Sequence, residues 1–144
     1  MNGHPLDSAF RATSYRIETD EGVFTVRIAR LHCAFDAYLR RKGASCWGLL
    51  TAYNPGAIRC AGQNAAQHER LRERLKARGW TVLPALNVPD DAAAPVEPGF
   101  LLLQASEKEV AELAADFAQV AFVCGNIGAS ARLIYVADRP LPQS

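Results

Sequence analysis

The polar residues whose types and spacing best suit binding chemistry lie in one stretch near the middle of the 144-residue chain, at the Thr51–Asn64 junction. An apolar segment over 46–53 ends there, an Asn-Pro-Gly turn follows at 54–56, and a helix is predicted from about Gly62. The first turn of a helix carries unpaired N–H groups and about half a positive charge, which attract carboxylates and phosphates. The junction therefore predicts a pocket for a small polar or anionic ligand, such as a phosphate or a nucleotide.

The inward face of the predicted helix contains an amide, which strengthens this interpretation. Leu71 and Leu75 form an apolar stripe, and helical steps backward along it reach Asn64. A buried amide must find hydrogen-bond partners, because leaving it unpaired costs about 1–3 kcal/mol. We therefore expect Asn64 to face a space shared with Asn54, in or beside one pocket. The predicted ligand-binding residues are the hydroxyls of Thr51 and Tyr53, the amides of Asn54, Gln63 and Asn64, the guanidinium of Arg59, and, on the opposite wall, Gln119 and Asn126.

The opposite wall depends on how two strands run. Gln119 precedes the predicted strand Val120–Cys124, and Asn126 follows it. If this strand lies parallel to the one at 46–53, their carboxyl ends meet, and clefts outside such ends are the usual ligand sites of open sheets. That arrangement would bring Asn126 to the pocket.

The residues predict neither a metal nor a cofactor. The chain has no H-x-x-x-H or paired-carboxylate motif, and His32, Cys33, Cys60 and His68 match no compact ligand set. None of the four cysteines forms a C-x-x-C pair, so we expect reduced, unpaired thiols. The turn lacks the G-K-[ST] sequence that grips phosphates in nucleotide-binding loops. The pattern does not distinguish catalysis from binding alone.

A rival interpretation is a structural or interaction module without enzymatic activity. The helical segment Glu69–Arg78 carries five basic residues against two acidic ones, and the basic side chains at 70, 74 and 78 form one ridge. This basic helix or a sheet edge would then bind a protein or a nucleic acid. We do not expect a nucleic acid, because the net charge is +1 and no aromatic platform accompanies the ridge. A monomer or a weak homodimer is expected.

Composition and periodicity predict an α+β fold in a single domain. Hydrophobic residues make up 49% and charged residues 22%, as in ordinary globular proteins. No apolar run is long enough to span a membrane, and no secretory signal precedes the domain, so a cytoplasmic protein is expected. The predicted order is ββαβ-α-ββαβ-β, a mixed β-sheet with about three helices packed on it. We expect a flexible N-terminal arm over 1–12, the domain over 13–138 and a C-terminal tail over 139–144.

Individual elements have their own signals. Two alternating runs around Gly22 predict a β-hairpin, and a helix from about 62 to 78 should close at Gly79. Pro84 should move the strand at 80–86 to an edge or a bulge. Residues 87–99 read as a loop. Ser106 and Glu109 form a capping box that predicts the start of a further helix.

Several blocks of sequence together resemble a known family. They are TAYNPG at 51–56, Gln63-Asn64 with LRERLKARGW at 71–80, EPGFL at 97–101 and FAQVAFV at 117–123. They resemble the small bacterial proteins grouped as domain of unknown function 3293, over roughly residues 14–135. That family's T-A-[WY]-N-P block is matched by residues 51–55 and its helix-opening Asn by Asn64. Its Q-N-A block is matched at 119–121, where Val120 replaces the usual Asn. The resemblance implies a cytoplasmic bacterial single domain and carries no assigned activity.

Overall fold

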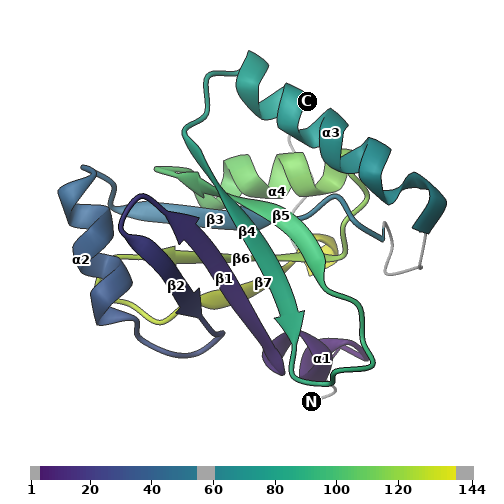
Figure 1. The fold of residues 1–144 in the computed structure, drawn as a ribbon, viewed down its shortest axis with the longest axis horizontal. Coiled ribbons are helices and arrows are strands. Elements are labelled where there is room, and N and C mark those ends of the chain that lie inside the picture. The colour runs from purple at the N-terminus through teal and green to yellow at the C-terminus, as the bar shows by residue number, and fades with distance from the viewer. Residues whose placement is uncertain (1–3, 55–60, 139–144) are drawn as a thin grey trace.

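A seven-stranded, strongly curled sheet forms the centre of the protein, in the order β2-β1-β4-β5-β3-β6-β7 (Figure 1). The computed structural model describes residues 4–54 and 61–138. The strands are β1 (Thr13–Thr19), β2 (Gly22–Val26), β3 (Cys46–Leu50), β4 (Val82–Pro89), β5 (Glu97–Leu103), β6 (Ala121–Asn126) and β7 (Arg132–Tyr135). The helices are α1 (Asp7–Arg11), α2 (Cys33–Arg41), α3 (Ala61–Ala77) and α4 (Glu107–Asp116), and a 3-10 turn follows at Val136–Asp138.

The α+β class and the single sheet with helices packed on it are as predicted, but the sheet is not mixed. Every pair of strands in the described ranges is antiparallel. The helical crossovers do join strands that point the same way, as such crossovers usually do. However, β5 lies between β3 and β4, and β3 lies between β5 and β6. The crossovers through α3 and α4 therefore each span one inserted antiparallel strand, and no two of the described strands are parallel neighbours.

The two faces of the sheet carry separate apolar layers, because side chains alternate along each strand. On one face, α2 packs through Phe35 and Leu39 against strand residues that include Trp47. We call this the α1–α2 face, since Phe10 of α1 also packs there. On the other face, Leu71 of α3 and Leu113 of α4 contact the buried strand residues. The helices thus cover both faces: α1 and α2 cover one, and α3 and α4 cover the other.

Local signals predicted several element boundaries correctly. The β1–β2 hairpin turns at Gly22, whose φ is 109°. Helix α3 is followed by Gly79 with φ 74°, and Trp80 N donates to Leu75 O, as in a helix-terminating glycine turn. Ser106 caps α4, and Ser106 and Glu109 bond reciprocally as a capping box.

Pro84 does not place its strand at an edge, contrary to the expectation. β4 lies between β1 and β5. The β1 ladder reaches only to Ala85, so Pro84 has one strand neighbour, opposite Phe100 of β5. A residue without an N–H is tolerated there, because no second ladder requires it.

The segment predicted as an N-terminal arm contains α1, which is held against the sheet. Thr13 Oγ1 donates to Ala9 O at 2.8 Å, and the Tyr15 hydroxyl donates to Phe10 O at 2.9 Å. Both carbonyls lie near the end of α1, where helical carbonyls lack partners within the helix. The first turn is held by Tyr135, which donates to Asp7 Oδ1 at 2.7 Å. The predicted domain limits at 12/13 and 138/139 stay a prediction.

Cys33 and Cys46 are free thiols, as expected. Cys124 is buried and lies within hydrogen-bond distance of Arg132, and Cys60 lies outside the described residues. Among the described residues, no helix is both long and apolar enough to cross a bilayer.

The capping box gives a direct stability test. Ser106→Ala removes the oxygen that accepts from Glu109 N at 3.1 Å, so the free energy of unfolding should fall by about 1 kcal/mol in urea denaturation. Ser106→Asp keeps an acceptor at the helix start and should stay within about 0.5 kcal/mol of wild type. Equal losses in both variants would show that the cap does not stabilise α4.

Candidate functional site

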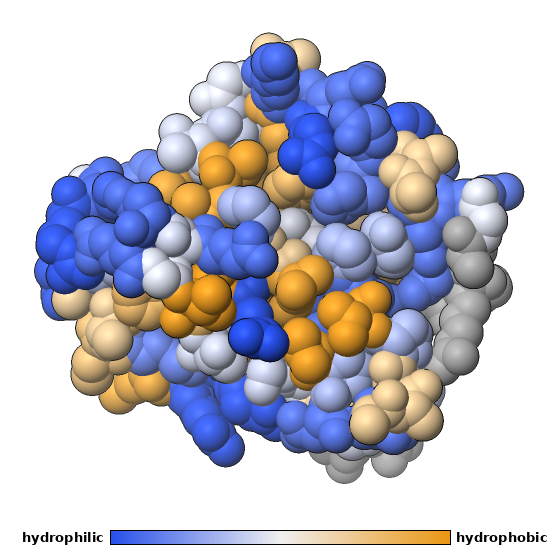
Figure 2. All heavy atoms as spheres, in the orientation of Figure 1, coloured by the Kyte–Doolittle hydropathy of each residue, from blue (hydrophilic) through white to orange (hydrophobic). Residues whose placement is uncertain are grey.

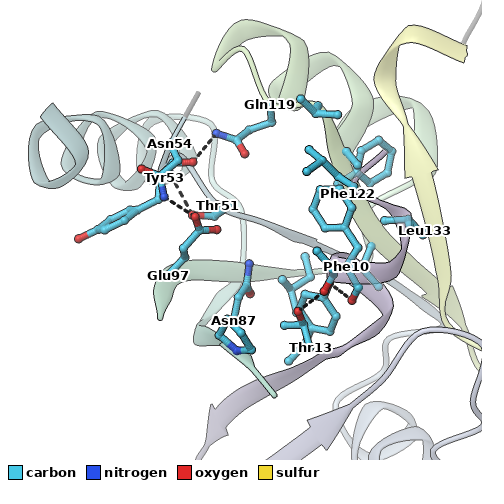
Figure 3. Close-up of a pocket in the computed structure, with 18 of the residues that line it drawn as sticks. Phe10, Thr13, Thr51, Tyr53, Asn54, Asn87, Glu97, Gln119, Phe122 and Leu133 are labelled. Carbon is cyan, nitrogen blue, oxygen red and sulfur yellow. Dashed lines mark hydrogen bonds between the residues drawn. The ribbon is translucent and has the colours of Figure 1, made fainter. Parts of the chain in front are cut away.

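A cavity of about 290 Å³ lies on the α1–α2 face, between α1 and the strands, at the end of the sheet where β3 finishes and β6 begins (Figure 3). Much of its wall is apolar, including Leu6 and Phe10 from the α1 region and Leu49 and Leu133 from the sheet. Polar groups converge on it from the strands and from two loops. They are Thr13, Thr51, Asn54, Asn87, Glu97 and Gln119. Small-molecule sites commonly combine apolar walls with a few placed polar groups in this way.

Four of the predicted site residues line this cavity. They are Thr51, Tyr53 and Asn54 after β3, and Gln119 before β6. Gln119 Nε2 donates to Tyr53 O at 3.0 Å, which joins the two walls directly (Figure 3). The sequence therefore predicted correctly that the loop after β3 and the residues around β6 meet.

Asn126 lies elsewhere, which corrects the prediction. β3 and β6 are antiparallel, and Asn126 is opposite Cys46 at the start of β3. The end of β3 therefore meets the beginning of β6, which brings Gln119 to the cavity and leaves Asn126 at the far end of the pair. The expectation for Asn126 depended on parallel strands.

Gln63 does not line the cavity, because it is exposed on the first turn of α3. Arg59 lies outside the described residues, so its predicted contact with an anion stays a prediction.

Asn54 and Asn64 do face each other, as predicted, and form a clasp between the β3–α3 loop and α3. Asn54 N donates to Asn64 Oδ1 at 2.8 Å, and Asn64 Nδ2 donates to Asn54 Oδ1 at 2.9 Å. Asn54 has φ 51°, a left-handed conformation that asparagine adopts more readily than most residues. Asn64 is only 7% exposed and does not line the cavity. Its amide positions Asn54.

The clasp continues from Asn54 to β5. Asn54 Nδ2 donates to Glu97 Oε2, so one carboxylate oxygen at the cavity is held by an amide from the opposite loop. Thr51 adds a second link to β5, because its hydroxyl donates to Pro98 O at 2.7 Å while accepting from Tyr53 N at 3.0 Å. The polar end of the cavity is thus fixed by side chains from α3, the loop and β5.

The α1 wall is fixed by hydroxyl groups with perturbed acidity. Burial is the main cause that raises the pKa of Tyr15, whose hydroxyl donates to Phe10 O. Burial, together with the hydrogen bond to Asp7, raises the pKa of Tyr135 to about 12. Both phenols therefore stay protonated and act as donors that hold α1 in place.

Sequence reasoning missed Asn87, Glu97 and Tyr15 as cavity residues. It assigned 87–99 to a loop, whereas β4 and β5 pair as far as Asn87 and Glu97. Tyr15 is opposite Asn87 on the other side of β4, so the three side chains form one row across three strands. Every second residue along a strand faces the same side, so stepping by two from Leu83 reaches Asn87, and stepping back by two from Leu101 reaches Glu97. This alternation was the signal in the sequence that could have found them.

His68 is a packed histidine and not a base at the cavity. Its ring stacks on Phe100 with centroids 4.7 Å apart and meets Tyr53 edge-on at 5.9 Å. Burial, and then the charge of Arg72, lower its pKa. A neutral ring in an aromatic sandwich fits this environment.

Two residues of the basic ridge on α3, Arg70 and Arg74, are engaged in contacts within the protein. The guanidinium groups of Arg70 and Arg74 lie 5.6 and 5.3 Å from the ring of Phe117. Arg74 also pairs with Asp116 at 3.1 Å. Figure 2 shows hydrophilic side chains over α2 and α3, with apolar ones gathered between them. Side chains already stacked or paired are poorly suited to track a phosphate backbone.

Within the described ranges, no cluster of three or more His, Cys, Asp or Glu side chains could hold a metal ion. The fold and the cavity define an α+β domain with a space of small-molecule size on one face of a curled antiparallel sheet. The family model described as "Protein of unknown function (DUF3293)" matches residues 50–122, and the chain belongs to this family. No curated protein and no solved structure matched the chain. The matched range contains the clasp and the polar end of the cavity, whereas α1, β1 and β7 lie outside it.

The clasp predicts a specific loss of stability. Asn64→Ala removes both hydrogen bonds and leaves Asn54 N–H without its acceptor, so the free energy of unfolding should fall by about 1–3 kcal/mol in urea denaturation. Gln63→Ala, one residue earlier on the exposed side of α3, should change it by less than about 0.5 kcal/mol. Similar effects of the two substitutions would contradict the clasp.

The contact between α1 and β7 predicts a shifted titration. The hydrogen bond from Tyr135, and then that from Arg11, hold the pKa of Asp7 below its ordinary value. This carboxylate therefore favours the folded state above its ordinary pKa, and the contribution disappears as pH falls through the lowered value. In an NMR titration, Tyr135→Phe should raise the pKa of Asp7. The pKa of Asp20, which Lys42 and Tyr38 lower at a distant site, should not move. An unchanged Asp7 pKa in Tyr135→Phe would refute the assignment.

Proposed function

We propose that this protein binds a small polar molecule in the cavity between α1 and the sheet. The observation that carries the proposal is the cavity itself, a space of about 290 Å³ with apolar walls and six convergent polar side chains. Its volume is at the low end for ligand sites, which suits a molecule of about one ring.

The rigidity of the polar end of the cavity supports a ligand-binding role rather than a purely structural one. Asn54 is fixed by Asn64 from behind, and Gln119 is fixed through Tyr53 O. Binding groups that are held by a surrounding shell lose little conformational entropy when a ligand arrives. The Asn64 amide provides the brace, and the cavity-lining amides of Asn54 and Gln119 provide the binding surface.

The charge of the wall modifies the ligand expected from the sequence. The predicted anion relied on Arg59 and the start of α3. Among the described lining residues, Glu97 is the single acidic residue, and none is basic. We therefore place a polar molecule without a net negative charge first, and an anion becomes the second arm of the test.

A cavity-filling variant tests this function. Phenol and benzyl alcohol serve as neutral probes, with inorganic phosphate and adenosine monophosphate as anionic ones, in a thermal-shift assay. A probe at about 100 times its Kd should stabilise wild type by about 2.7 kcal/mol, a rise of several degrees in Tm. Leu133→Trp fills part of the cavity and should abolish the shift.

The matched control is Ile134→Trp, at the next residue of β7. Ile134 has similar partial burial and packs against the opposite apolar layer, so this variant should keep the wild-type response. Binding by no probe, or equal binding by both tryptophan variants, would contradict the proposed function. A response to phosphate or adenosine monophosphate alone would restore the anionic ligand.

A further inference from the structure

We infer that the ligand presents an N–H donor, from an ammonium or an amide group, to Asn87 Oδ1, with a compact apolar body against α1 and β7. The inference rests on the proposed function and names the chemical class of its ligand. Asn87 comes from the middle of the row formed with Tyr15 and Glu97, so it lies at the floor of the cavity (Figure 3).

The first argument is an unpaired acceptor. Asn87 Oδ1 is buried and has no hydrogen-bond partner among the described residues. Buried carbonyl oxygens almost always accept at least one hydrogen bond, because losing their hydration without replacement is costly. An N–H group of a ligand in the cavity would supply the missing donor. No other described side-chain oxygen that lines the cavity is both buried and unpaired.

The second argument is that the hydroxyl protons around the cavity are already used. Thr13 donates to Ala9 O, Tyr15 to Phe10 O, and Thr51 to Pro98 O. These hydroxyls can still accept, but they no longer offer a proton to an incoming ligand. The wall is therefore richer in acceptors than in free donors. Such a wall matches a ligand that carries donors and disfavours one that carries only acceptors.

The third argument is electrostatic. Glu97 contributes a carboxylate beside Asn87, opposite it in the β4–β5 ladder, and Asn54 Nδ2 already donates to one of its oxygens. A carboxylate this close attracts a cation or a polarised N–H and repels an anion, most strongly where water is excluded.

The wall opposite Asn87 determines the size and polarity of the rest of the ligand. Phe10 and Leu133 lie across the cavity from Glu97 and Asn87 (Figure 3). A single ring or a short branched chain attached to the donor would contact these side chains while its head group reaches Asn87. The arrangement separates an apolar end from an acceptor-rich end.

Four probes with one phenyl body and different head groups test the inference. They are toluene, benzylamine, benzamide and benzoate, each titrated into the full chain and followed by the NMR signals of Asn87 and its neighbours. Benzylamine or benzamide should bind more tightly than toluene, and benzoate should bind most weakly. Preference for benzylamine assigns an ammonium group, and preference for benzamide assigns an amide.

Substitutions at Asn87 isolate the hydrogen bond. Asn87→Leu keeps a similar side-chain size and removes the acceptor, so the preferred probe should bind about three- to tenfold more weakly, the effect of one hydrogen bond. Its affinity for toluene should not fall. The Tm of the unliganded variant should be equal to or above that of wild type, because an unpaired buried oxygen is removed. Asn87→Asp keeps acceptors and should retain binding of benzylamine.

The outcomes separate this inference from the proposed function. If none of the four probes binds and the neutral and anionic probes of the preceding section also fail, the cavity is not a ligand site. If toluene or benzoate binds at least as well as the donor-bearing probes, the cavity is a site and the inferred head group is wrong. An unchanged affinity in Asn87→Leu, or a clearly lower Tm of that variant, would also overturn the role of Asn87.

Discussion

The position of β5 between β3 and β4 is the constraint on which the rest of the structure depends. Because β5 pairs on both sides, its register is fixed twice, by Leu49–Leu101 toward β3 and by Asn87–Glu97 toward β4. A shift of one residue on either side would move each β5 side chain from one apolar layer to the other and break its cross-strand packing. This double pairing aligns the end of β3 with the start of β5, and so sets the Thr51 loop beside Glu97.

Much of the architecture could be predicted from the sequence because its signals are local. The hairpin at Gly22, the end of α3 at Gly79 and the capping box at Ser106 each depend on a few neighbouring residues, and the structure contains all three. Strand order, in contrast, depends on segments that lie far apart in the sequence. Nothing within the β3–α3–β4 segment indicates that a strand lying further along the chain will insert between β3 and β4, so parallel neighbours were inferred and the sheet proved antiparallel.

The candidate site shows the same division. The meeting of Asn54 with Asn64 followed from helical periodicity and from the cost of an unpaired buried amide, and the structure contains both hydrogen bonds. Asn126 failed because its placement required the direction of a distant strand. Asn87 was overlooked because proline-rich surroundings masked the alternation that continues β4. Side chains held by long-range pairing cannot be assigned to a site until the pairing is known.

The attachment of α1 has a consequence for the order in which the chain becomes complete. The hydrogen bond between Tyr135 and Asp7 joins residues 128 positions apart, so one wall of the cavity is secured by a strand that is synthesised long after α1. During translation, this contact cannot form until β7 has been made. Closing the long loop between Asp7 and Tyr135 costs more conformational entropy than closing a local turn does. The matched range, which holds the clasp and the β4–β5 pair, can therefore acquire its pairing earlier, and the enclosed space appears only when α1 and β7 meet.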